Sequence, residues 1–216
     1  ARGYLSHYLS KLDESIIHYE RALRIFKKKS RFHETALILS NQSENYRHKS
    51  KHTQARNLCR KAHELATQLQ NIHLQTYALI NEGWVMIHIP NDAALHTFEN
   101  GHRLTEQWDE DDDDLTLVRC EVHCATAHIL LHMADYKSAL KQATLALENA
   151  ELGGDMLSLG MAYRTLGNVM SMLADVPHAE FSNPEEYYRT ALSAFQEIEA
   201  FGEVARTLMA HANSLA

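Results

Sequence analysis

Tyr19-Glu20-Arg21-Ala22-Leu23 is the first copy of a short pattern that recurs along the chain and decides its fold. Within the pattern, Tyr19 and the small residue Ala22 lie three positions apart, so a helix places both on one face. The residues that correspond to Ala22 follow at intervals of 40, 39, 45 and 45: Ala62, Gly101, Ala146 and Ala191. A recurrence at this interval is typical of proteins built from stacked structural repeats.

The residues between these copies have the period of helices. Ile16, Tyr19, Leu23 and Phe26 are spaced by three and four positions, which is the pattern of a helix with one buried face. The 216 residues include only 8 Gly and 3 Pro, too few for a loop-rich or β-rich fold. We therefore predict an all-α protein of about 11 helices. The expected helices cover residues 2–10, 13–29, 33–48, 51–70, 73–88, 91–107, 115–133, 136–152, 155–173, 184–200 and 202–215.

Helix stop and start signals separate these segments. Gly153-Gly154-Asp155 predicts a helix end followed by an N-cap, and Ser182-Asn183-Pro184 predicts a helix start with proline in the first turn. The run Asp109–Asp114 predicts a solvated connector, and we expect its last residue, Asp114, to cap the next helix. The run lacks the alternating ligands and central glycine of an EF-hand.

Several residues at corresponding places in the five units extend the repeat. They are Gly3, Tyr19, Ala22-Leu23, Tyr46, Ala55, Ala62, Gly83-Trp84, Phe98, Asp135-Tyr136, Ala139, Ala146, Leu166-Gly167-Asn168, Tyr188 and Ala191-Leu192. This set resembles the tetratricopeptide repeat family, in the long-repeat arrays attached to large bacterial signalling regulators. Ser15 and Gly101 depart from the family's alanines, and the usual proline at the end of each unit is missing.

The resemblance implies an α-solenoid of antiparallel helix pairs wound into a right-handed superhelix. We expect a single array over residues 1–216, with units at about 1–31, 32–71, 72–112, 113–153 and 154–201 and a final helix at 202–216. Because the chain begins inside a repeat and without Met, we expect it to be a fragment of a longer protein.

In this family the first helix of each pair lines a concave groove, which implies a set of partner-binding residues. Asparagine amides can hydrogen-bond a peptide backbone, tryptophan offers an apolar anchor, and arginine can bind a carboxylate at two points. The groove positions expected to bind a partner are Asn41, Glu44, His48, Asn81, Trp84, His88, Cys124, His128, His132, Arg164 and Asn168.

The sequence predicts a binding function without catalysis. It contains no glycine-rich phosphate loop, nucleophile elbow or paired metalloprotease histidines, so we expect no enzyme activity and no cofactor in this fragment. Three Cys cannot form a disulfide framework, which favours the cytoplasm, and no apolar run could span a membrane. We expect a scaffold or sensor module that binds a peptide or protein segment, and we do not expect nucleic acid as a partner.

Two alternatives stay open at this point. Cys120, Cys124, His128 and His132 share one face of the helix at 115–133, so this domain could respond to a metal or other ligand. These four side chains spread over roughly 18 Å, so a metal would need a ligand such as His88 from the preceding helix, and we assign no metal site. The second alternative is self-association through charge, since residues 1–70 carry 14 Lys and Arg against 6 Asp and Glu, whereas residues 71–216 carry 7 against 22.

Overall fold

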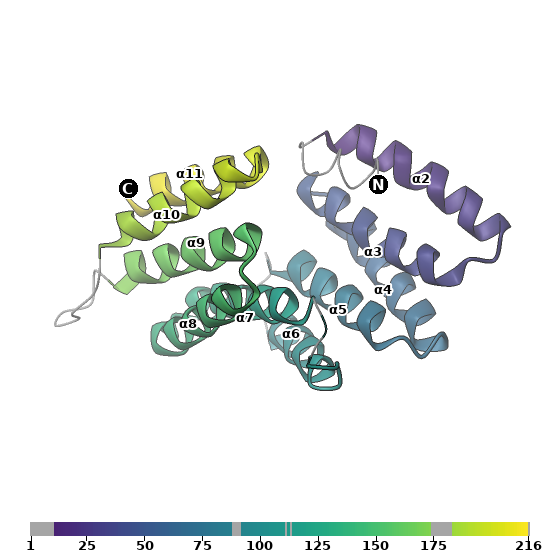
Figure 1. Cartoon of the computed structure of the whole chain (residues 1–216), viewed down its shortest axis with the longest axis horizontal. Helices are drawn as coiled ribbons and strands as arrows, with labels where there is room; N and C mark the ends of the chain where they lie inside the picture. The colour runs from purple at the N-terminus through teal and green to yellow at the C-terminus, as the bar shows by residue number, and fades with distance from the viewer. Residues whose placement is uncertain (1–10, 88–91, 111, 113, 174–182, 216) are drawn as a thin grey trace. The chain divides into compact units, whose positions relative to one another are not determined.

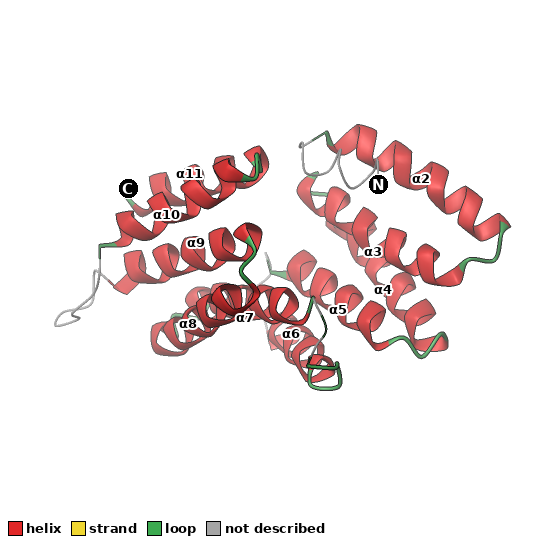
Figure 2. Cartoon of the chain, viewed as in Figure 1, coloured by secondary structure: helices red, strands yellow, loops and turns green. Residues whose placement is uncertain are grey.

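The chain is helical throughout the part that the structure describes. The structure is a computed structural model that describes residues 11–87, 92–110, 112, 114–173 and 183–215. Within these residues it has ten α-helices and no strand, which confirms the all-α prediction (Figures 1 and 2). The helix expected at 2–10 lies outside them. No helix in the described ranges combines the length and the apolar character needed to cross a membrane.

The helices fall into two compact units, residues 1–109 and 110–216. The first contains α2 (Leu12–Lys28), α3 (Phe32–His48), α4 (His52–Gln68), α5 (Ile72–Met86) and α6 (Asp92–Thr105). The second contains α7 (Leu115–His132), α8 (Tyr136–Gly153), α9 (Met156–Leu173), α10 (Pro184–Glu197) and α11 (Phe201–Ser214). In each unit, successive helices pack against each other. The first helices of the pairs also touch one another, α3 with α5, α7 with α9, and α9 with α11. A single array over both units stays a prediction.

Five tight turns between helices share one backbone device that the sequence did not reveal. Each turn places one residue other than glycine in the left-handed region, with φ between 52° and 58°. The following residue donates its N–H to the carbonyl five positions earlier, at 2.8–3.0 Å. This bond satisfies a carbonyl at the helix end, as in a Schellman motif. The left-handed residues are Ser30, Ser50, Gln70, Ala134 and Glu199.

The second helix of each pair buries a narrow stripe of mostly small side chains. In α4, for example, the buried residues Ala55, Cys59, Ala62 and Ala66 recur at spacings of four, three and four. The equivalent stripes are Ala94, Phe98, Gly101 and Thr105 in α6 and Ala139, Ala143, Ala146 and Ala150 in α8. Small side chains allow two helix axes to approach closely, so the small residues that recur in the sequence lie where the helices meet.

The second residue of each stripe packs against one small residue on the first helix of the same pair. We call this small residue the notch residue. Phe98 fills the space above Gly83, and a Cβ on Gly83 would lie 2.6 Å from its Cζ atom. Tyr188 fills the space above Gly167 in the same way, at 2.9 Å.

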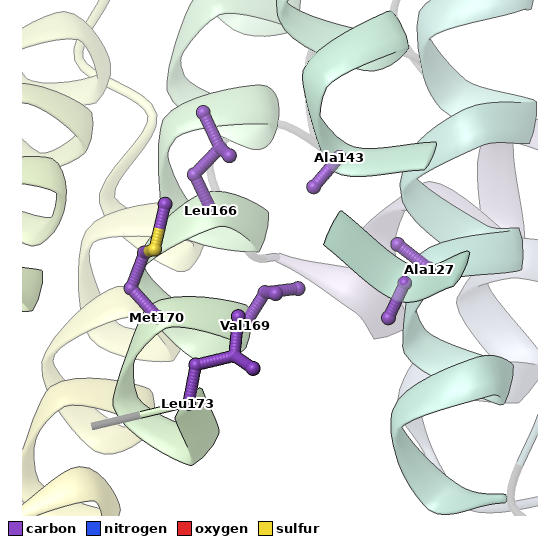
Figure 3. Packing of buried hydrophobic residues seen from close by; sticks show 7 residues of the cluster. Ala127, Ala143, Leu166, Val169, Met170 and Leu173 are labelled. Carbon is purple, nitrogen blue, oxygen red and sulfur yellow. The ribbon is translucent and has the colours of Figure 1, made fainter. Parts of the chain in front are cut away.

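The other two pairs combine smaller side chains. Ser43 lies close enough to Cys59 to lower the pKa of its thiol, against the larger effect of burial. Ala143 and Ala127 share one buried cluster with Leu166 and Val169, as Figure 3 shows. The notch residues are therefore Ser43, Gly83, Ala127 and Gly167, and the two glycine notches accept the two aromatic partners.

The helix boundary signals are confirmed in two places and wrong in one. Gly154 ends α8 with φ 68°, and the Asp155 carboxylate accepts the Ser158 N–H at 2.9 Å. Asn183 caps α10, with Pro184 in its first turn. Asp114 precedes α7, but its side chain makes no capping hydrogen bond because its backbone is already helical. The connector expected at residues 174–183 lies almost wholly outside the described residues.

Replacing Ala134 by glycine tests the left-handed turns. Glycine adopts positive φ without the steric cost of a Cβ, so Ala134→Gly should raise the free energy of unfolding by about 0.5–1 kcal/mol. The matched control is Ala205→Gly within α11, where added flexibility should lower it by about 1 kcal/mol. Urea denaturation measures both, and a destabilised Ala134→Gly protein would contradict the turn assignment.

Replacing Gly83 by alanine tests the notch. The new methyl group would overlap the Phe98 ring, so we expect a loss of about 1–3 kcal/mol of stability despite the better helix propensity of alanine. Gly101→Ala is the control in the same unit, because its Cβ would lie 3.4 Å from Ile80, an ordinary contact. Thermal unfolding should show no loss for the control, and equal effects of the two substitutions would refute the notch.

Candidate functional site

A partly exposed residue directly follows each notch residue, and these positions give each of the two units a pair of candidate binding residues. They are Glu44 on α3, Trp84 on α5, His128 on α7 and Asn168 on α9, and none of them is fully buried or fully exposed. Adjacent residues on a helix point about 100° apart. The notch residue therefore contacts the second helix of its pair while the next residue lies at the edge of that contact. We call these four the face residues, and all were predicted as binding residues.

In the first unit, Trp84 is held between side chains of two other helices. The Arg47 guanidinium lies over the indole at 5.7 Å from the ring centroid, and Phe98 meets the indole edge to face at 5.8 Å. The Arg47 side chain also lies 3.3 Å from Nε2 of His48, another predicted binding residue. Because these contacts fix the ring orientation, the exposed part of Trp84 is a rigid apolar surface beside a positive charge.

Two predicted asparagines of this unit have different surroundings. Asn81 is buried, and its amide donates to the Ser40 hydroxyl at 2.9 Å, which joins α5 to α3. Asn41 on α3 is half-buried, as is His48. His88, also a predicted site residue, lies outside the described residues. A direct contact between any of these side chains and a partner stays a prediction.

In the second unit, Asn168 is oriented by a residue of the neighbouring helix. The phenol of Tyr188 donates to its Oδ1 at 2.9 Å, so the Asn168 amide group keeps its two N–H donors for another acceptor. On α7, which contacts α9, His128 is half-buried. His132 is exposed one turn further along the same helix. The structure therefore places polar groups of α7 and α9 on the partly exposed side of this unit.

Arg164 lies near these residues in an ion pair between α9 and α11. Its Nη1 donates to a Glu203 carboxylate oxygen at 2.6 Å, and its guanidinium lies over the Phe195 ring at 5.3 Å. Arg206 pairs with the second oxygen of Glu203. Burial alone would raise the pKa of Glu203, but the two arginines outweigh burial and hold that pKa well below its usual range. Arg164 thus joins two first helices and brings positive charge to their partly exposed side.

The cysteines of α7 lie in the helix interface. Cys120 and Cys124 are buried against Ala146, Ala150 and Ala162 of α8 and α9. Hydrogen bonding to Cys124 and burial both raise the pKa of Cys120, so it stays a thiol at neutral pH. Among the described residues, no group of three His, Cys, Asp or Glu side chains could hold a metal ion. The metal-responsive alternative stays a prediction, because His88, the further ligand it needs, lies outside the described residues.

Two residues that hold the site were not predicted from the sequence, namely Arg47 and Glu203. The repeat interval itself is a signal that could have revealed such residues, because side chains about 40 residues apart in the sequence meet on adjacent first helices. Arg164 pairs with Glu203, 39 positions further on, and Asn81 bonds Ser40, 41 positions earlier. Searching for opposite charges or hydrogen-bonding pairs at that interval would have found the Arg164–Glu203 pair.

Comparison with known proteins supports this architecture. No family model matches the sequence, and no curated protein matches it significantly. A solved structure of a Rap protein complexed with Competence and Sporulation Factor is similar over 95% of this chain, with a TM-score of 0.78 and 15% identity. The apo form of the quorum sensor NprR from B. thuringiensis is similar over 96%, with a TM-score of 0.67 and 14% identity.

This chain spans just over half the length of each, 55% and 56%. Similarity at this low identity concerns the fold alone. It confirms that the chain has a tetratricopeptide-like repeat fold.

The surroundings of His128 predict a dependence of stability on pH. Burial, together with Arg164 and His132, lowers the pKa of His128 to about 4. The unfolded chain takes up this proton near pH 6.5 and the folded chain does not, so stability falls as the pH drops from about 6.5 towards 4. We expect this group to lower the free energy of unfolding by about 2 kcal/mol at pH 5, relative to pH 7.5.

His128→Gln should remove that part of the pH dependence. The melting temperature measured at pH 7.5 and pH 5 should fall less in this variant than in the wild type. His33→Gln, at an exposed histidine of α3, is the control and should behave as the wild type does. An unchanged pH dependence in His128→Gln would contradict the expected titration.

Proposed function

We propose that the face residues and their neighbours bind a peptide or an extended segment of a partner protein, and that the chain is an interaction or sensor module of a regulatory protein. The observation that carries this proposal is the repetition of the face. In each unit, two adjacent first helices each present one partly exposed polar or aromatic side chain directly after a notch residue. Repeated positions of this kind suit an extended ligand, whose own side chains also recur at regular intervals.

The chemistry of the face favours recognition over catalysis. Trp84, between Arg47 and Phe98, offers an apolar anchor, and Asn168, held by Tyr188, offers amide donors for a peptide carbonyl. Side chains that are already fixed lose little conformational entropy when a ligand binds. We propose no catalytic step, cofactor or nucleic-acid partner for this chain, and we propose a cytoplasmic location.

The structural neighbours are consistent with this role. One is described in complex with Competence and Sporulation Factor, and the other is described as a quorum sensor. We extend to this chain only the class of function, namely regulation through a bound peptide or protein segment. Self-association of its basic and acidic parts stays a separate prediction, and added salt would weaken an association of that kind.

Peptides selected from a phage-displayed random library on the wild-type chain provide a probe for this proposal. Asn168→Ala and His132→Ala should each raise the calorimetric Kd of a selected peptide at least about tenfold, a loss of roughly 1.4 kcal/mol. Gln196→Ala removes an exposed amide from the second helix α10 and should leave the Kd unchanged. Melting temperatures would identify any variant that loses binding because it unfolds.

The proposal fails if selected peptides bind Asn168→Ala and His132→Ala with wild-type affinity. It also fails if the library yields no peptide that binds the folded chain with a measurable Kd.

A further inference from the structure

In the first unit, α5 carries a second aromatic side chain on the same side as the face residue Trp84. Tyr77 lies seven positions before Trp84, and seven residues make almost two full turns, so a helix places both on one side. Both side chains are half-buried. Because each residue of an α-helix adds about 1.5 Å along the axis, the two lie roughly 10.5 Å apart along α5.

Each of these two rings is held by a buried aromatic residue of the same unit. Phe98 on α6 meets Trp84 edge to face at 5.8 Å between ring centroids, and Trp108, which follows α6, meets Tyr77 at 5.9 Å. Phe98 and Trp108 are both buried. Trp108 is itself fixed, because its indole N–H donates to the Thr76 hydroxyl at 3.3 Å. The half-buried rings of Tyr77 and Trp84 are therefore oriented apolar surfaces.

The adjacent first helix, α3, adds an apolar side chain at the Tyr77 end. Leu37 takes the place on α3 that Tyr77 takes on α5, six residues before the notch residue. The two helices contact each other, and side chains about 40 positions apart meet there, as Ser40 and Asn81 do. Leu37 is 40% exposed. We call Trp84 the first anchor, and Leu37 with Tyr77 the second anchor.

Helix packing does not require an apolar residue at the place of Tyr77. A requirement of the fold would recur in every repeat. In the second unit, however, this place is taken by Glu121 on α7 and by Met161 on α9, although each helix has its notch residue six positions further on. The pair of oriented rings on α5 is thus a feature of the first unit alone, and it fits a role in binding.

An amide between the two anchors favours an extended ligand over a helical one. Asn41 on α3 is half-buried, four positions after Leu37 and three before the face residue Glu44. Its amide can bond a peptide N–H or C=O group. An extended segment offers these groups, whereas a helix uses them for its own hydrogen bonds. In a polyproline-II segment, residues three positions apart lie on one side at about 9.3 Å, close to the separation of the anchors.

On the basis of the peptide-binding function proposed above, we propose that the first unit binds an extended segment with two apolar side chains three positions apart. One side chain packs on Trp84 and the other packs on Leu37 and Tyr77. A second copy of this chain is a poor source of such a segment, since the part of the chain that the structure describes consists of helices joined by short connections. The ligand is therefore an extended segment of a different protein or a free peptide.

A phage library of defined spacing tests this proposal on the 216-residue chain. Each displayed peptide has two fixed leucines separated by one to six random residues. Selection on the wild type should enrich the peptides with two residues between the leucines. These peptides should shift the indole N–H signal of Trp84 saturably in NMR, and Trp84→Phe identifies that signal among the two tryptophans. Inserting one serine between the leucines should raise the Kd at least about tenfold, because only one anchor can then be filled.

A matched pair of substitutions locates the second anchor. Leu37→Asp should raise the calorimetric Kd of an enriched peptide at least about tenfold. The control is Ile17→Asp, because Ile17 is 48% exposed on α2, on the side opposite the buried Ser15 and Tyr19. This control should change the Kd less than about twofold. Melting temperatures verify that both variants are folded.

A double-mutant cycle assigns each leucine of the peptide to one anchor. Each leucine is replaced by alanine in turn, and both peptides are measured on the wild type and on Leu37→Ala. One replacement should cost at least about threefold less affinity on Leu37→Ala than on the wild type, and the other should cost the same on both.

The possible results separate this proposal from the peptide-binding function on which it rests. Peptides that bind without moving the Trp84 signal would overturn the proposal and leave binding by the second unit intact. Enrichment of six residues between the leucines would indicate a helical ligand and also overturn it, as would equal losses from Leu37→Asp and Ile17→Asp. A Trp84 signal that depends on protein concentration without peptide would assign the surface to a second copy. If neither this library nor the random one yields a binding peptide, both proposals fail.

Discussion

The close approach of paired helices is the constraint on which the rest of this structure depends. At each described pair the volume of one side chain on the second helix is matched by a small residue on the first. Gly83 accepts Phe98 and Gly167 accepts Tyr188, whereas the smaller Cys59 meets Ser43. Because interiors are close-packed, such a pair tolerates little change in total volume. Gly83 and Gly167 therefore serve helix contacts, while five turns place residues other than glycine at positive φ.

The same contact positions the candidate binding site. When a notch residue is fixed against the second helix, the helix period fixes the direction of the next residue. Trp84 follows Gly83 and Asn168 follows Gly167, and each is then held by the aromatic residue that fills the notch. Packing and the proposed recognition share these aromatic side chains, so a change in Phe98 or Tyr188 would affect both.

Much of the fold could be predicted from the sequence, because the recurring small residues and the helical period are local signals. The site was predictable only in part. Glu44, Trp84, His128 and Asn168 are partly exposed as a binding role requires, but Asn81 and Cys124 are buried between helices. Successive residues on a helix point about 100° apart, so neighbours in the sequence can differ in burial. Which of them is buried depends on where the neighbouring helix lies, and the local sequence pattern does not show that. The ion pair of Arg164 with Glu203 arises from that neighbour too.

A double-mutant cycle that transplants the Ser43–Cys59 pair into α5 and α6 tests the central claim most directly. Its corners are the wild type, Gly83→Ser, Phe98→Cys and the double variant, compared by the free energy of unfolding. Gly83→Ser should crowd Phe98 and Phe98→Cys should leave a cavity, so each alone destabilises. If matched volumes hold the pair together, the double variant should lose less free energy of unfolding than the two single losses added together, by at least about 1 kcal/mol. A coupling energy near zero would show that notch and partner act independently and would contradict the account.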